Sequence, residues 1–300
     1  MRWFAAVLRL VVKPRVRRMS PPQKARGHLR LLARLVFRQP PHALVLSCAA
    51  RGDAPPFSRI AVGLPAPRRV ILYFHGGGYV AGSPATHAPM LARLAKLSGV
   101  EVRAPDYRLA PEAPFPAAFD DAKAAFKQAL AAGYRPGDIV LGGDSAGGGL
   151  ALALLAWCCA RGQRPAALFA FSPWTDLTGS GASMHQNAAR DAYLPAERID
   201  ELAGLYLGDA ARDDPRASPV FAAFAEPPPV LLQVSETEIL RDDTLRMAER
   251  LRAQGGAVTV QTWANAPHVW QVFDGWLPEA RAALREVATF VQASFAPARR

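Results

Sequence analysis

The sequence predicts an α/β domain in which a mostly parallel central sheet carries helices on both faces. From about residue 44 of the 300-residue chain, strand-like and helix-like segments alternate. Several strand-like segments are unbroken apolar runs, which are typical of strands buried on both faces. Strands separated by helices form a parallel sheet, so a ligand is expected beyond the carboxyl ends of the strands.

The first two strands, over 43–49 and 58–65, are expected to form an antiparallel pair, and RRVILYF (68–74) is the first continuous apolar strand. Further strands are predicted at 100–105, 138–143, 166–173, 229–235 and 257–263, and helices at 87–98, 116–132, 145–161, 242–254 and 279–294. The alternation stops over 175–225, a polar segment with one predicted helix near 196–206. We expect this segment to be a cap insertion over one face of the sheet.

The net charge of +11 comes entirely from the N-terminal arm, residues 1–42. Residues 1–40 hold eleven Lys and Arg and no acid, whereas 41–300 hold 25 residues of each sign. The arginines at 26, 30, 34 and 38 are spaced four apart and form one stripe of a predicted helix. An earlier apolar helix is expected to break at Pro14.

The favoured interpretation of the arm is a basic helical cap segment packed on a catalytic domain that spans 43–300. A weak contact with a membrane surface is an alternative, because the arm is amphipathic and basic. A signal peptide is disfavoured because Arg9 interrupts the apolar run and no small-residue cleavage site follows. No run is long enough to span a bilayer. Nucleic acid is not expected as a partner, since no recognition motif is present.

The three cysteines, Cys48, Cys158 and Cys159, argue against a disulfide framework because their number is odd and two are adjacent. No Cys or His spacing is typical of a zinc site, so no metal is predicted. A reducing compartment, the cytoplasm, is the expected location.

The stretch GGDSAGGG (142–149) follows an apolar strand and opens a predicted helix. It lacks the lysine of a phosphate-binding P-loop and the spacing of a dinucleotide turn. It contains GxSxG, from Gly143 to Gly147, which in this context is typical of a tight turn that exposes a nucleophile. The helix N-terminus favours negative charge beside that residue. The stretch therefore predicts a nucleophilic Ser145.

A serine hydroxyl needs a base, which in α/β-hydrolase chain order follows the acid on a loop after the last strand. Among six histidines only His268 lies there. The acid must hold the histidine tautomer and stabilise the imidazolium. It is expected in SETEILRDD, where Asp242 and Asp243 resemble the start of a helix, so that position leaves Glu236 and Glu238.

A second glycine cluster, HGGGYVAG (75–82), directly follows the strand over 68–74. The tetrahedral intermediate of acyl transfer carries an oxyanion, which needs preorganised N–H donors. Glycines let the backbone approach that oxygen closely. The donors are expected from this loop and from Ala146, the residue after the nucleophile.

Four motifs, HGGGY, DYRLAPE, FPAAFDD and GDSAGG, together resemble the hormone-sensitive-lipase-like carboxylesterases, the bacterial family IV esterases of the α/β-hydrolase fold. The resemblance covers about residues 70–295. It implies Ser145 as nucleophile and His268 as base. It also implies an oxyanion hole formed by Gly76, Gly77 and Ala146, with Gly78 assisting the loop.

The family commonly shows D-x-L-x-D after its penultimate core strand, and here that place holds Glu238-Ile239-Leu240-Arg241-Asp242. The resemblance therefore implies Glu238 as the triad acid, with Asp242 as the alternative. Three DYRLAPE residues are expected to brace the floor of the site: Asp106, Arg108 and Glu112. Three aromatic residues are expected either to line an acyl pocket or to pack in the core: Tyr79, Trp174 and Tyr193.

The expected function is that of a serine carboxylesterase that hydrolyses short-to-medium acyl esters through an acyl-enzyme, without cofactor or metal. A lactone hydrolase or a small-metabolite deacetylase would use the same residues. From another class, the fold also hosts non-catalytic ligand-binding receptors, which a missing histidine would favour. The expected partner is a small-molecule ester, and the resemblance also allows a homodimer through an edge strand.

Overall fold

The structure, a computed structural model, describes residues 1–18 and 22–295. One eight-stranded sheet runs in the order β1-β2-β4-β3-β5-β6-β7-β8. The strands are β1 (Ala43–Cys48), β2 (Phe57–Val62), β3 (Val70–Phe74), β4 (Glu101–Pro105), β5 (Ile139–Asp144), β6 (Ala167–Phe171), β7 (Val230–Ser235) and β8 (Val258–Trp263). The first two strands pair antiparallel as expected, and β3 to β8 are mutually parallel. The predicted fold class is confirmed.

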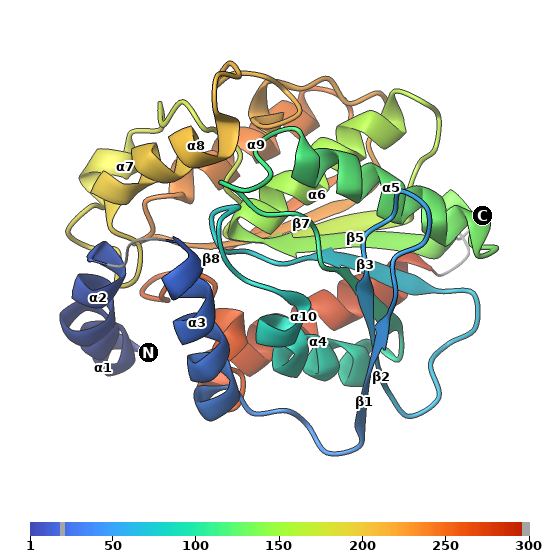
Figure 1. The fold of residues 1–300 in the computed structure, drawn as a ribbon, viewed down its shortest axis with the longest axis horizontal. Coiled ribbons are helices and arrows are strands. Elements are labelled where there is room, and N and C mark those ends of the chain that lie inside the picture. The colour runs from blue at the N-terminus through green and yellow to red at the C-terminus, as the bar shows by residue number, and fades with distance from the viewer. Residues whose placement is uncertain (19–21, 296–300) are drawn as a thin grey trace.

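Helices cover both faces of the sheet (Figure 1). One face carries α5 (Ala117–Ala131), α6 (Ser145–Cys159) and α9 (Arg241–Arg252), and the other carries α4 (Pro84–Ser98) and α10 (Pro278–Ser294). Each face has its own apolar core. Strands β3, β5, β6 and β7 are buried along their whole length, which explains their continuous apolar sequences.

The arm is helical over the residues described there: α1 (Arg2–Val7), the π-helical turn η1 (Leu8–Val12), α2 (Lys13–Arg17) and α3 (Pro22–Val36). The predicted break at Pro14 is wrong, because the proline lies in the first turn of α2, where it tolerates its missing N–H. The wider turn η1 precedes it. Phe4 of α1 and Phe37 after α3 both contact Phe273, so both parts of the arm pack against η5 (Trp270–Phe273).

The insertion, residues 175–225, contains α7 (Ser183–Gln186), η3 (Ala196–Arg198), α8 (Ile199–Leu207) and η4 (Pro219–Phe221). The sequence predicted α8 but not the short α7. The insertion and the arm lie at the same end of the molecule (Figure 1). The Lys13 ammonium is buried and donates to the carbonyl oxygens of Ala188 at 2.7 Å and Asp191 at 2.9 Å. This buried lysine fixes the arm to the insertion.

Helix α6 approaches its neighbours so closely that glycine is required in its first turns. A Cβ added at Gly149 would lie 2.1 Å from the carbonyl oxygen of Trp174, in the loop after β6. Backbone atoms there would have to move, since no flexible side chain can yield. By contrast, a Cβ at Gly204 in α8 would meet no atom within 4 Å.

We predict that Gly149→Ala lowers the free energy of unfolding by about 2–3 kcal/mol, because the added methyl overpacks a buried contact. The matched variant Gly204→Ala raises it by about 0.5–1 kcal/mol, because alanine loses less entropy in a helix. Denaturant titration of both variants measures the difference. Equal effects of the two changes would contradict the close-packing account.

Candidate active site

Ser145 lies at the turn that joins β5 to α6. Its φ of +51° is in the left-handed region, which is costly for a residue with a side chain. The turn has no space for further side chains: a Cβ at Gly143 would lie 2.3 Å from the carbonyl oxygen of Gly147, and one at Gly147 would lie 2.2 Å from that of Phe74. The GxSxG spacing therefore has a steric cause, and the turn it allows is the one expected for a nucleophile.

The residue before the serine, Asp144, organises a buried polar network beneath the turn. Its Oδ1 accepts the hydroxyl of Tyr73 at 2.7 Å and the N–H of Gly76 at 3.0 Å. Its Oδ2 lies 3.3 Å from Nε2 of His87 in α4. Burial raises the pKa of Asp144, but the nearby His87 outweighs burial and leaves that pKa below its ordinary value. The network joins β3, β5 and α4 at one carboxylate.

The loop over 75–82 follows β3 and turns back beside the serine. Gly77 and Gly78 both have positive φ, at +124° and +63°, which explains two of the three consecutive glycines. The N–H of Gly76 is engaged by Asp144. In the part of the chain that the structure describes, no hydrogen bond engages the N–H groups of Gly77 and Gly78.

His75, at the start of this loop, is a structural residue. It is fully buried, and burial lowers its pKa to about 3, so the ring is neutral at physiological pH. Its ring stacks on Tyr107 with centroids 4.3 Å apart, and the Tyr107 hydroxyl donates to the His75 carbonyl at 2.6 Å. Tyr107 belongs to the DYRLAPE motif, and no sequence pattern indicated that it would hold this loop.

The structure brings His268 and Glu238 together. Nδ1 of His268 lies 2.6 Å from Oε2 of Glu238, and both residues are buried. The other oxygen, Oε1, accepts the hydroxyl of Ser172 at 2.9 Å and the N–H of Ser235 at 2.7 Å. Burial lowers the pKa of His268, but the hydrogen bond and charge of Glu238 raise it more, so that pKa lies above its ordinary value. One carboxylate oxygen of Glu238 therefore contacts the histidine, while the other keeps its hydrogen bonds to Ser172 and Ser235.

Asp242, the alternative acid, does not contact His268. Its Oδ2 accepts the N–H of Ser183 at 2.8 Å, and it lies in the first turn of α9, as its sequence position indicated. Asp243 accepts the N–H groups of Thr175 and Asp176, each at 2.9 Å, and burial raises its pKa to about 7. Both aspartates therefore anchor the insertion.

The loop after β6 connects the serine turn to the acid. The N–H of Trp174 donates to the carbonyl of Ser145 at 2.9 Å, while two residues earlier Ser172 donates to Glu238. Parallel pairing of β5 with β6 and of β6 with β7 places these loops at one edge of the sheet. This is the carboxyl edge, where the topology predicted the ligand site.

The insertion also holds the acid loop, residues 236–240. The side-chain amide of Asn187 donates to the carbonyl oxygens of Glu236 at 3.0 Å and Glu238 at 2.8 Å. The Oδ2 of Asp191 accepts the N–H of Ile239 at 3.0 Å. The sequence did not indicate either residue, because their partners lie about fifty positions further along the chain.

The three predicted aromatic residues are buried or partly buried beside these loops. Tyr79 stacks on Tyr206 of α8 with centroids 3.7 Å apart and also contacts Trp174 at 6.2 Å. Tyr193 stacks beside the His268 ring at 6.3 Å. Tyr79 and Trp174 are part of the core on the α6 face, while Tyr193 belongs to the surroundings of the histidine.

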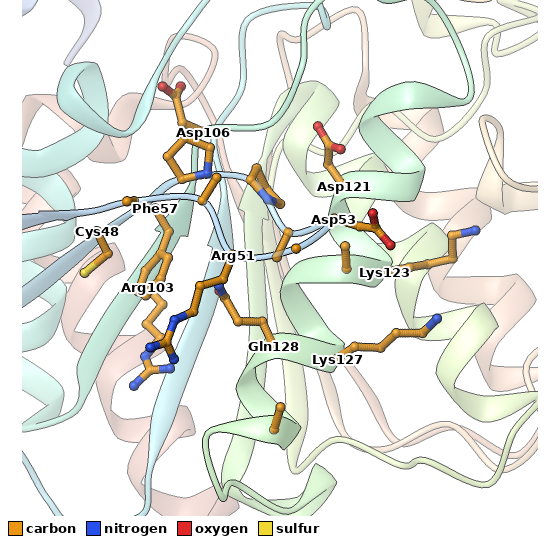
Figure 2. A pocket seen from close by; sticks show the side chains of 18 of the residues that line it. Cys48, Arg51, Asp53, Phe57, Arg103, Asp106, Asp121, Lys123, Lys127 and Gln128 are labelled. Carbon is orange, nitrogen blue, oxygen red and sulfur yellow. The ribbon is translucent and has the colours of Figure 1, made fainter.

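The three predicted bracing residues differ in what they contact. Arg108 pairs with Asp121 of FPAAFDD at 2.7 Å, and Glu112 pairs with Arg26 of the arm at 2.7 Å. Asp106 lines an open groove of about 1500 Å³ between the β1–β2 loop and α5 (Figure 2). Lys127 of α5 lines the same groove. Ser145, Glu238 and His268 are not among its lining residues, so this groove is separate from the candidate site.

Within residues 1–18 and 22–295, no group of three or more His, Cys, Asp and Glu side chains is arranged to hold a metal ion. The three cysteines are free thiols, and burial raises the pKa of Cys159 to about 11. The polar groups at the site are those of a serine, a histidine–carboxylate pair and free backbone N–H groups. Such a set is suited to acyl transfer.

Comparison with known proteins agrees with this chemistry. A family model described as the alpha/beta hydrolase fold matches residues 71–272. The chain is 39% identical to an acetyl-hydrolase of Streptomyces hygroscopicus over 225 residues, which is 75% of each protein. It is 36% identical to an esterase of Acinetobacter venetianus over 224 residues, 74% of each.

Solved structures extend the similarity to nearly the whole chain. The crystal structure of an esterase from the bacterial hormone-sensitive lipase family superposes with a TM-score of 0.88 at 36% identity, covering 93% of each chain. The chain belongs to the hormone-sensitive-lipase-like esterases of the α/β-hydrolase fold and is a carboxylic ester hydrolase.

Proposed function

We propose that Ser145, His268 and Glu238 form the catalytic triad of this esterase. The short contact between Nδ1 of His268 and the carboxylate of Glu238 carries the proposal, since it fixes the tautomer in which Nε2 is free to accept a proton. Glu238 is favoured over Asp242 because only Glu238 contacts the histidine.

The reaction follows from these positions. Ser145 Oγ forms a bond to the ester carbonyl carbon while Nε2 of His268 takes its proton. The resulting oxyanion collapses, the bond to the alcohol oxygen breaks, and the alcohol leaves with that proton. Water then attacks the acyl-enzyme by the same proton transfers and releases the acid. The raised pKa of His268 suits a group that must hold the proton between the two transfers.

We assign the oxyanion donors to Gly77, Gly78 and Ala146. This differs from the expectation in one residue: the N–H of Gly76 is used by Asp144, so Gly76 anchors the loop and does not donate to substrate. Ala146 lies in the first turn of α6, where backbone N–H groups have no helical partner. The helix dipole adds to the stabilisation of negative charge there.

We propose that the arm and the insertion together form a cap over the site, supported by the contacts of Lys13 with the insertion. Short acyl esters are the proposed substrates, in keeping with the acetyl-hydrolase among the relatives and with the aromatic packing of Tyr79, Trp174 and Tyr206. The intact pair of His268 and Glu238 favours catalysis over a receptor role. A homodimer through an edge strand and a cytoplasmic location stay predictions.

The triad is tested by hydrolysis of p-nitrophenyl esters of graded acyl length. We predict that Ser145→Ala lowers kcat by about 10⁴–10⁶-fold and Glu238→Gln by about 10³–10⁴-fold. Asp242→Asn is the matched control and retains most of the activity, because Asp242 contacts Ser183 rather than His268. If Asp242→Asn abolished activity and Glu238→Gln did not, Asp242 would be the triad acid. Turnover confined to lactones or acetylated metabolites would favour those substrate classes with the same residues.

The acid limb of the pH profile provides a second test. The neutral form of His268 is the base, and Glu238 raises its pKa, so in the wild type kcat/KM rises through a pKa above the ordinary histidine value. Glu238→Gln removes the largest cause that raises the pKa of His268, ahead of the charges of Asp191 and Asp144, and leaves the burial that lowers it. We therefore predict that the acid limb of the kcat/KM profile of Glu238→Gln lies at lower pH than that of the wild type. An unmoved limb would show that another group controls it.

A further inference from the structure

The arm presents an apolar surface to solvent, although its other side is packed on the protein. We call these exposed side chains the outer face: Trp3, Leu10 and Val11 of α1 and η1, and Leu31, Leu32 and Leu35 of α3. Trp3, Leu10 and Leu35 are more than 70% exposed. These six are half of the twelve exposed large apolar side chains among the residues that the structure describes, although the arm is a small part of the chain. Such a concentration marks an interaction surface.

Helix α3 shows how the outer face arises. Its inner side is fixed by Arg26, which donates to Val80 and Ala110 carbonyl oxygens, each at 2.8 Å, and pairs with Glu112. Ala33 is buried on the same side. The opposite side carries the exposed leucines, and beside them run Arg30 and Arg34, one turn apart. Among the described residues no salt bridge involves Arg34, and the charge of Arg30 acts on Asp106 without a direct salt bridge.

The charge of the arm defines the chemistry of its partner. Residues 1–40 hold eleven basic residues and no acid, while the remainder of the chain is neutral. Glu197 and Glu112 pair with Arg17 and Arg26, and the exposed Arg34 has no such salt bridge among the described residues. A basic partner is therefore excluded, and an anionic one is favoured. Exposed leucines beside arginines, as in α3, are typical of helices that lie in the headgroup region of a bilayer, and α1 adds an exposed tryptophan, a residue enriched at that boundary. Single-stranded nucleic acid would instead need aromatic platforms for its bases.

We infer that the outer face binds the surface of an anionic phospholipid membrane. The leucines and Trp3 enter the boundary between headgroups and acyl chains, and Arg30 and Arg34 contact the lipid phosphates. No described helix is long and apolar enough to cross a bilayer, so the arm lies on the surface. This inference does not depend on the triad assignment, because it concerns a face that the chemistry does not use.

The outer face is preformed, which lowers the cost of binding. Lys13 holds the arm to the insertion, and Phe4 and Phe37 hold it to Phe273. A membrane-bound arm therefore carries the whole domain in one orientation. Arg26 on the inner side of α3 contacts Val80 of the loop over 75–82, so the bound arm stays joined to that loop.

The test is co-sedimentation of the full chain with vesicles of phosphatidylcholine alone and of phosphatidylcholine with phosphatidylglycerol. We expect binding to the anionic vesicles only, and release at high salt. Arg30→Gln/Arg34→Gln lowers the partition coefficient about 30-fold, from about 1 kcal/mol for each basic residue at the surface. Leu35→Ser lowers it about tenfold through lost burial.

Two matched variants separate the outer face from general charge and exposure. Leu64→Ser alters a leucine that is 99% exposed in another loop, and Arg285→Gln/Lys127→Gln removes two exposed charges elsewhere. Neither changes binding more than about twofold, since they lie outside the contact. Unchanged hydrolysis of a water-soluble ester and unchanged circular dichroism show that each variant is folded.

Three results would overturn the inference. One is failure of the wild type to bind anionic vesicles at low salt. Another is equal weakening by the outer-face variants and the matched variants, which would indicate charge attraction without a docking face. The third is self-association or DNA binding that depends on Leu35 while vesicle binding does not, because the outer face would then serve another macromolecule.

Discussion

The left-handed turn at Ser145 is the constraint around which the rest of the structure is arranged. A side chain at positive φ is strained, so the surrounding elements must hold it in place. They do so by close approach: α6 begins against the end of β3, and glycines at 143 and 147 make that approach possible. The serine is thereby presented at a helix N-terminus, beside a loop whose free N–H groups come from the adjacent strand.

Two buried carboxylates complete the arrangement on either side of the serine. Asp144 joins β5, the strand that leads to Ser145, to the loop over 75–82 through the N–H of Gly76. Glu238 joins the loop after β6, the end of β7 and His268. Each carboxylate is fully hydrogen-bonded, as a buried charge must be. One holds the backbone of the loop over 75–82, and the other holds the ring of His268, the proposed base.

Much of this could be predicted from the sequence, because the signals are local. Unbroken apolar runs and glycine clusters revealed the sheet, Ser145 and the loop over 75–82, and chain order alone selected His268 among six histidines. What could not be predicted depends on partners distant in the chain. The use of the Gly76 N–H by Asp144, and the support of the acid loop by Asn187, exist only after the strands have assembled. The choice of Glu238 needed a resemblance, and the structure supplies its contact.

The hydrogen bonds from the insertion to the acid loop have a consequence for how the insertion can move. Asn187 and Asp191 form hydrogen bonds to the backbone of Glu238 and Ile239. An outward movement of the insertion would therefore break contacts that hold Glu238 in place. The insertion and the loop over 236–240 therefore behave as one unit. A substitution at Asn187 or Asp191 would alter the position of Glu238 as well as the packing of the insertion.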